Sequence, residues 1–457
     1  GCGKLGMAKL ASSTTSIGAS AFMATALLTD ETVEFNTVDC ATATGGGAAD
    51  IFIFVCPLKW TEGTGGGVSW AGRYGHAAVC FDNGVIVTTG GYASGASSDV
   101  QRTTPGGTAL AVVTQSAQTE FTARYGHAIA RVSGDANAFL VVGGLGSSTP
   151  GYLNDALLTI DRGENFLQQS TNVFISACNY AGLVAVGNGS FVAFGGAAGP
   201  FYYNQVRRSI DFGVTWTTLR LNDPGASGVD TGGDACANKQ IWTPRREIGY
   251  AYMPVRKRII LGGGQVDSNT ASNEVWGSDD GGTCWALLAA DIDAVTGGFR
   301  VFRAPSLAVV TLIGIEVLVF AGGKDEIANT YLNTVYRSIN AGVTWELVGG
   351  SSGAIWTGRW RSALVFDSAN KRLAILGGRD ITGEKQNDFW DTSVNAFIRT
   401  VRKMKFARYP CVLSHSSHPH LLPQLLTTRL LSTHTPAARR AGTQQAARSV
   451  AAPARRS

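Results

Sequence analysis

Short apolar segments that end in a pair of glycines recur along the chain. They are VIVTTGG (85–91), FLVVGG (139–144), FVAFGG (191–196), RIILGG (258–263), VLVFAGG (317–323) and LAILGG (373–378). The first glycines of successive pairs are 53, 52, 67, 60 and 55 residues apart. Each segment is short and almost continuously hydrophobic, which is typical of a strand covered on both faces. A period near 50 residues predicts an array of similar β-modules.

Two further landmarks keep a constant order around each glycine pair. An arginine-centred segment lies 17–19 residues before the pair in five units: GRYGHAAV (72–79), ARYGHAIA (123–130), PRREIGYA (244–251), FRAPSLAV (302–309) and GRWRSALV (358–365). The remaining unit has ACNYAGLV (177–184), which contains no arginine. A polar strand start follows 8–11 residues after the pair, as in NEV (273–275). Six unrelated hairpins would not preserve this order.

In five of the six units, an octet related to the pattern S-x-D/N-x-G-x-T-W directly follows the strand that begins with these polar residues. Its five versions, two of them degraded, are TTPGGTAL (103–110), TIDRGENF (159–166), SIDFGVTW (209–216), SDDGGTCW (278–285) and SINAGVTW (338–345). An Asp or Asn side chain can accept backbone N–H bonds within a turn, and glycine permits a left-handed residue. We therefore expect a structural turn in each module.

The three landmarks resemble the kelch repeat, and the octet resembles the Asp-box of sialidases and other propellers. The resemblance covers roughly residues 50–393 and implies an all-β, six-bladed β-propeller of four-stranded antiparallel blades. The sixth unit has no octet. We expect the segment DIFIFVCPLKW (50–60) to supply the missing outer strand of the last blade, because Trp60 precedes Arg73 by 13 residues as Trp345 precedes Arg359 by 14.

Composition divides the chain into three parts. Glycine accounts for 58 of 457 residues and only 16% are charged, which favours an all-β protein rich in turns. We expect residues 1–49 to be poorly ordered, residues 50–398 to form the propeller, and residues 399–457 to be a basic, disordered tail. From residue 395 onward there are eleven Lys or Arg and no acids, so the rest carries 27 basic and 33 acidic residues. We predict no nucleic-acid partner for this mildly acidic body.

The repeated arginines are the candidate ligand-binding positions. In kelch propellers this position lies at one face of the central channel, where clustered guanidinium groups suit a carboxylate or phosphate. Aromatic residues that directly follow some of these arginines could form the sides of a binding site. The predicted ligand-binding set is Arg73, Tyr74, Arg124, Tyr125, Arg245, Arg303, Arg359 and Trp360. In the alternative, each arginine pairs with an acid of its own or the next blade, such as Asp82, Asp99, Asp155 or Asp388.

Two kelch-type or Asp-box enzymes provide alternatives to a binding protein. Sialidases carry a Phe-Arg-Ile-Pro segment ahead of their first Asp-box, and Phe302–Pro305 comes close, but it occupies the arginine position of its own repeat. Galactose oxidase needs a copper site, whereas His76 and His127 occupy equivalent repeat positions and are better explained as framework residues. We therefore predict no catalytic residues, no metal and no cofactor.

The expected function is noncatalytic binding of a protein or glycan ligand, which could be anionic, at the loop-lined channel face. A sialidase-like or other glycoside hydrolase is the alternative. We expect a monomer without a membrane span, because no apolar run approaches 18–20 residues. Among the eight cysteines, Cys40 with Cys56 is the first disulfide to test. The compartment stays open, with a secreted or cell-surface setting slightly favoured.

Overall fold

The computed structural model describes nine stretches of the chain: residues 60–63, 70–113, 121–147, 151–222, 236, 242–292, 302–312, 314–349 and 356–394. It also gives the backbone of four strands, β1 (Ser16–Gly18), β2 (Thr42–Gly45), β3 (Phe52–Val55) and β36 (Arg399–Thr400), which pair in the order β1-β2-β3-β36. The protein is all-β, as the composition predicts. None of its described elements is a helix that could cross a membrane.

Antiparallel sheets with one common strand path make up most of the described residues. Sheet 1 consists of β5 (Ala77–Cys80), β6 (Ile86–Thr89), β7 (Val100–Arg102) and β8 (Ala111–Val112). Sheet 2 consists of β10 (Ala128–Arg131), β11 (Phe139–Val142), β13 (Ala156–Thr159) and β14 (Leu167–Ser170). Sheet 3 consists of β15 (Asn179–Gly187), β16 (Ser190–Ala198), β18 (Val206–Ser209) and β19 (Thr217–Arg220), with β17 (Phe201–Tyr202) also paired to β16.

The second half of the chain continues the same path. Sheet 4 consists of β20 (Gly249–Met253), β21 (Arg258–Gly262), β22 (Val275–Ser278) and β23 (Ala286–Ala289). Sheet 5 consists of β25 (Ser306–Leu312), β26 (Ile315–Ala321), β29 (Val335–Ser338) and β30 (Glu346–Gly349). Sheet 6 consists of β32 (Ala363–Asp367), β33 (Arg372–Leu376), β35 (Phe389–Ser393) and β4 (Thr61–Glu62).

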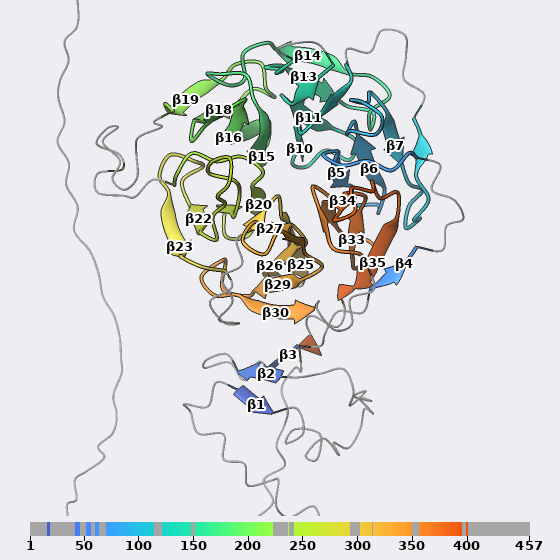
Figure 1. Ribbon diagram of the computed structural model, residues 1–457, viewed down its shortest axis with the longest axis vertical. Coiled ribbons are helices and arrows are strands. Elements are labelled where there is room, and N and C mark those ends of the chain that lie inside the picture. The colour runs from blue at the N-terminus through green and yellow to red at the C-terminus, as the bar shows by residue number, and fades with distance from the viewer. Residues whose placement is uncertain are drawn as a thin grey trace, which may run out of the picture. The chain divides into compact units, whose positions relative to one another are not determined.

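These sheets lie around a common axis (Figure 1). The first strand of each sheet contacts the first strands of the sheets before and after it, and β32 of sheet 6 contacts β5 of sheet 1. An apolar cluster lies between each successive pair of sheets, including one between sheets 6 and 1. The second strands, such as β11 and β33, are buried along their whole length. Burial on both faces explains their nearly continuous hydrophobic sequences.

The short N-terminal strand β4 pairs with β35 of sheet 6. In β4, Thr61 and Glu62 pair with Asp391 and Trp390 of β35. The predicted segment was residues 50–60, and that range is wrong: β4 begins directly after Trp60, whereas β3 lies within the predicted range and pairs with β2 and β36. Trp60 is buried between sheets 5 and 6 and contacts Trp356 edge-on. The outer strands β19, β23 and β30 likewise begin directly after an octet tryptophan.

Each glycine pair consists of two left-handed residues, which directly follow the second strand in every sheet but sheet 3, where β16 continues through them. Gly90 and Gly91 have φ values of 57° and 100°, and the other pairs have similar values. In sheet 4 the equivalent residues are Gly263 and Gly264, with φ values of 64° and 100°, so the sequence assignment to 262–263 was one residue early. Three consecutive glycines, 262–264, conceal the correct register in the sequence.

Candidate ligand-binding face

Four of the predicted arginines are buried inside the sheets. Arg124 has no exposed surface; its Nη1 and Nη2 atoms donate to Asp155 at 2.8 and 2.7 Å, and Nη1 also donates to the Gly143 carbonyl oxygen. The same arrangement joins Arg73 to Asp99, Arg245 to Glu274 and Arg359 to Asp388. These guanidinium groups therefore fix the loop after the glycine pair, as the ion-pair alternative expected. Asp82 instead pairs with Arg131.

Arg303 does not occupy the repeated arginine position. The second glycine of each pair donates its N–H to the carbonyl oxygen at that position in the next sheet: Gly91 donates to Arg124, and Gly264 donates to Phe302. The position therefore holds Phe302 in sheet 5, and it holds Cys178 in sheet 3. The assignment of Arg303 as a repeat arginine is corrected by one residue, and its side chain reaches a different environment.

Two residues beyond the arginine position, six residues form a closed backbone ring. They are Gly75, Gly126, Tyr180, Glu247, Ala304 and Arg361. Each N–H donates to the carbonyl oxygen of its counterpart in the preceding sheet, and Gly75 closes the circuit by donating to Arg361. All six have φ between 49° and 65°, including four that are not glycine. The first two must be small, because the Tyr180 side chain covers them: a Cβ on Gly126 would lie 2.9 Å from its ring.

The larger side chains of this backbone ring form an ion-pair cluster. The Glu247 carboxylate is fully buried; it accepts from Arg303 Nε at 2.6 Å and also from Arg361. Burial alone would raise the pKa of the Glu247 carboxyl, but Arg361 and Arg303 outweigh it and lower that pKa to about 2. Arg361 lies over the Tyr180 ring at 4.5 Å and over the Trp360 ring at 4.1 Å. The carboxylate is thus held ionised and enclosed by cations.

A cavity of about 730 Å³ lies along the first strands of all six sheets, and the backbone ring is part of its lining. The rest of the lining is dominated by small and aliphatic residues, and the Asp82–Arg131 ion pair contributes further charge. The charged side chains of the lining are therefore Glu247 and Arg361 of the backbone ring and the Asp82–Arg131 pair.

Short pairings between loops build a surface beside the backbone ring, here called the mouth surface. The residue after the arginine position pairs with the residue after the glycine pair in every sheet. The pairs are Tyr74 with Tyr92, Tyr125 with Leu145, Asn179 with Ala197, Arg246 with Gln265, Arg303 with Lys324, and Trp360 with Arg379. Three of these pairs belong to short separate sheets, which contain β9 (Arg124–Tyr125), β12 (Leu145–Gly146), β24 (Phe302–Arg303), β27 (Lys324–Asp325), β28 (Thr330–Tyr331), β31 (Arg359–Trp360) and β34 (Arg379–Asp380).

The mouth surface contains a tyrosine cluster. Tyr74 stacks on Tyr92 with ring centroids 5.3 Å apart, and Tyr125 lies edge-on to Tyr92 at 5.2 Å. All three side chains are half-buried. Burial raises the pKa of Tyr74 and of Tyr125, so their hydroxyl groups stay protonated and can donate hydrogen bonds. Of the predicted site residues, the structure therefore gathers Tyr74 and Tyr125, while Trp360 is buried over Arg303 and Arg361.

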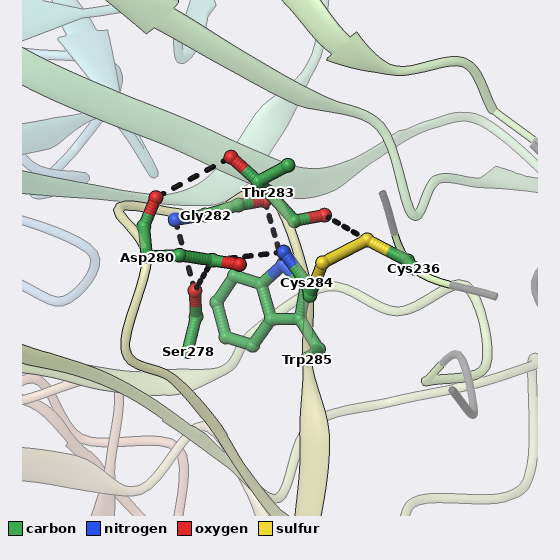
Figure 2. The surroundings of a disulfide bond; sticks show 7 residues. All are labelled: Cys236, Ser278, Asp280, Gly282, Thr283, Cys284 and Trp285. Atoms are coloured by element: carbon green, nitrogen blue, oxygen red, sulfur yellow. Dashed lines mark hydrogen bonds between the residues drawn. A yellow bond between two sulfur atoms is a disulfide. The ribbon is translucent and has the colours of Figure 1, made fainter. Parts of the chain in front are cut away.

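The octets form tight turns that pack one sheet against the preceding one. Figure 2 shows the fourth, in which Ser278 Oγ accepts from Gly282 N, Asp280 Oδ1 accepts from Cys284 N, and Trp285 Nε1 donates to the Gly282 carbonyl oxygen. The same bonds recur at 209–216 and 338–345. The glycine lies against the neighbouring sheet: a Cβ on Gly282 would be 2.8 Å from Val192. The octets are thus structural, and none lies at the mouth surface.

A disulfide joins Cys236 to Cys284 (Figure 2). Cys284 takes the place that Thr215 and Thr344 have in other octets, so it ties the long 220–243 connection to the turn. The sequence analysis did not predict this pairing, although the aligned octets show Cys284 where two others have threonine. The pairing of Cys40 with Cys56 lies outside the described residues.

His76 and His127 are largely buried between neighbouring sheets, where they also form part of the cavity lining. His127 Nε2 is 2.8 Å from Thr89 Oγ1, while His76 packs edge-on against Trp70. Burial, with a smaller effect of Arg73, lowers the pKa of His76 to about 3, so its ring is neutral at pH 7. Within the described part of the chain, no group of His, Cys, Asp and Glu side chains is arranged to hold a metal ion.

Sequence reasoning missed five residues of this region: Tyr92, Glu247, Arg361, Arg379 and Lys385. Tyr92 and Arg379 directly follow a glycine pair, and Glu247 and Arg361 lie two residues beyond the arginine position. Opposite charges at one repeat position, 247 and 361, were the available signal. This signal can be recognised only when the six units are aligned at the position two residues beyond the arginine position.

Comparison with known proteins supports the architecture. A family model described as the DUF6242 beta propeller domain matches residues 223–402, the part of the chain that contains sheets 4 and 5 and three of the four strands of sheet 6. A search of curated proteins finds no match. The family match and the circular packing of the sheets agree, and we conclude that the chain contains a β-propeller domain.

Proposed function

We propose that the protein is a noncatalytic binding propeller that recognises a protein or glycan ligand through its mouth surface. The observation that carries this proposal is the separation of roles between neighbouring residues. Arg73 and Arg124 are buried framework, whereas Tyr74 and Tyr125, which directly follow them, are half-exposed in one aromatic cluster. A rigid frame that presents aromatic side chains is a common basis of recognition sites.

The finer architecture belongs to the same proposal. We take the domain to be a six-bladed kelch-type propeller with Asp-box-type turns, whose last blade is completed by Thr61–Glu62. The closed backbone ring, the cluster between sheets 6 and 1, and the pairing of β4 with β35 support this assignment. A closed circuit of sheets leaves no open interface between blades, which suits a rigid platform.

A glycoside hydrolase is the second candidate, because Tyr180 and Glu247 are adjacent in the backbone ring beside two arginines. The electrostatics favour the binding role. The Glu247 carboxylate accepts hydrogen bonds from Arg303 and Arg361, and its pKa is lowered to about 2. Burial raises the pKa of the Tyr180 phenol, which opposes its use as a nucleophile. If this candidate were correct, the protein would release the aryl group from a chromogenic glycoside, and Glu247→Gln would abolish the release.

An array of immobilised saccharides and peptides tests the binding role. The wild-type protein should bind one class of ligand, and Tyr125→Ala should weaken that binding roughly tenfold or more, as expected for a central aromatic contact. Val112→Ala provides a matched control, because Val112 is exposed on the outer strand β8, away from the mouth surface. Equal binding by all three proteins would remove the mouth surface from the function.

A further inference from the structure

Two cations of the mouth surface face each other without a carboxylate between them. Arg379 and Lys385 are opposite residues of an antiparallel bridge across the turn 380–384. Like charges in directly opposite positions destabilise a pair of strands unless an anion neutralises them. Two acids lie in this turn. Asp380 is buried and accepts hydrogen bonds from Thr382 and Gln386, whereas Glu384 is exposed and forms no ion pair with either cation.

The equivalent position in sheet 5 shows the contrast. Lys324 also directly follows a glycine pair, but its Nζ lies 2.8 Å from Glu326, which in turn accepts from Arg303 at 2.9 Å. Arg379 donates only to the Gly383 carbonyl oxygen among the described residues, through Nε at 3.2 Å. Its terminal nitrogens remain available for a carboxylate, which a guanidinium can bind with two parallel hydrogen bonds.

Both cations lie beside the tyrosine cluster. The Arg379 guanidinium is 5.9 Å from the Tyr74 ring centroid, and Lys385 Nζ is 5.5 Å from that of Tyr92. The hydroxyl groups of Tyr74, Tyr92 and Tyr125 have no described hydrogen-bond partner within the protein. One small area therefore combines flat aromatic faces, phenolic hydroxyls and two cations that lack a carboxylate partner.

We infer that this area binds an acidic saccharide, with a sugar ring against the tyrosines and its carboxylate at Arg379 and Lys385. The inference rests on the binding role proposed above and names its ligand class. A sugar offers many hydroxyls and a flat C–H face, which tyrosines can meet with both their rings and their polar ends. An acidic peptide would meet the cations equally well, but it would leave the three phenolic hydroxyls with fewer partners. The mildly acidic body also disfavours a long polyanion such as a nucleic acid.

Isothermal titration of the full chain with an oligogalacturonide and with its methyl ester tests the inference. The two probes share one sugar body and differ in charge. The acid should bind, the ester should bind roughly tenfold or more weakly, and added salt should weaken the acid alone. Arg379→Gln/Lys385→Gln should weaken binding of the acid to the level of the ester. Arg256→Gln/Lys257→Gln is the matched control, since it removes the same two charges from the exposed turn between β20 and β21, outside the mouth surface, and it should leave the acid's affinity unchanged.

Three other results would overturn the inference and can be told apart. Equal binding of acid and ester, unaffected by the double substitution, removes the carboxylate subsite while the mouth surface stays a glycan site. Binding of a glutamate-rich peptide in place of the saccharide, lost in the double variant, makes the occupant a protein and preserves the proposed function. Absence of binding by either saccharide and by the peptide contradicts the inference and the proposed function together. Arg379 and Lys385 are both partly exposed, so we expect the variants to fold. Thermal unfolding of each variant checks this.

Discussion

Sheets 1, 2, 4 and 6 each pair a buried arginine with an acid beside the glycine pair, whereas sheets 3 and 5 have uncharged residues at the two corresponding positions. In sheet 3 the two positions are Cys178 and Gln205, and in sheet 5 they are Phe302 and Thr334. The two members differ together: at these two positions, neither sheet keeps the arginine without the acid or the acid without the arginine. A buried pair replaced as a unit can be nearly neutral, whereas one unpaired buried charge costs several kcal/mol. We therefore infer that the arginine and its acid stabilise the fold jointly and are replaced together.

Breaking one pair should have the largest effect on stability. Asp155→Ala leaves the fully buried Arg124 guanidinium without its carboxylate, and we expect the free energy of unfolding to fall by about 3–5 kcal/mol. Arg124→Phe/Asp155→Thr, copied from sheet 5, should lose much less, because no buried charge remains. Urea unfolding of the wild type, Arg124→Phe, Asp155→Thr and the double variant measures the coupling. Losses that simply add would contradict the idea of a unit.

The pH dependence of stability should distinguish the two kinds of sheet. Burial raises the pKa of Glu274, but Arg245 outweighs it, so the net pKa lies below its ordinary value. A lowered folded-state pKa contributes stability above the unfolded-state value, near 4.5, and that stability is lost as the pH falls. Glu274→Gln should cost roughly 1–3 kcal/mol at pH 7 and much less near pH 3.

Urea unfolding at the two pH values checks this prediction. The matched control is Gln205→Glu in sheet 3, which places an acid beside Cys178 rather than beside an arginine. It should be destabilised most at pH 7, where the new carboxyl would have to ionise in a buried place without a cation, and the loss should shrink at pH 3. Both losses should thus shrink at pH 3, in Glu274→Gln because protonation already weakens the wild-type ion pair and in Gln205→Glu because the new carboxyl is neutral. A loss in Glu274→Gln that is equal at the two pH values would mean that the pair with Arg245 does not determine the pH dependence.

The repeat landmarks predicted much of the fold because each one satisfies a local requirement. Glycine pairs were needed for two successive left-handed residues, and the apolar segments before them were needed for burial on both faces. Register was harder. Residues 262–264 are all glycine, so the sequence did not reveal which two leave the strand, and Arg303 lies next to Phe302 at the position that an arginine fills elsewhere. The predicted positions in sheets 4 and 5 were therefore each wrong by one residue, while the order of the landmarks was correct.

The candidate site was predicted less well than the frame because its residues owe their positions to contacts between sheets. Arginines that look exposed in a loop sequence are buried when an acid about 26 to 31 residues later pairs with them, as Asp99 and Asp155 do. Glu247 and Arg361 meet through side chains that come from sheets 4 and 6, 114 residues apart in the chain. Neither strand periodicity nor turn chemistry carries information about such a meeting.

A substitution at one of the two uncharged positions of sheet 5 should increase the stability of the protein, by a smaller amount than the changes above. Thr334 is 2% exposed, and its hydroxyl has no hydrogen-bond partner in the described part of the chain. Thr334→Val removes that hydroxyl at nearly constant shape and should raise the free energy of unfolding by about 1 kcal/mol. Thr103→Val is the control: Thr103 is equally buried, but its Oγ1 accepts from Ile86 N at 3.0 Å, so the same change should destabilise by about 1 kcal/mol. If both variants lost stability in urea, sheet 5 would satisfy Thr334 in a way that its uncharged pair does not explain, and the two kinds of sheet would differ less than their side chains indicate.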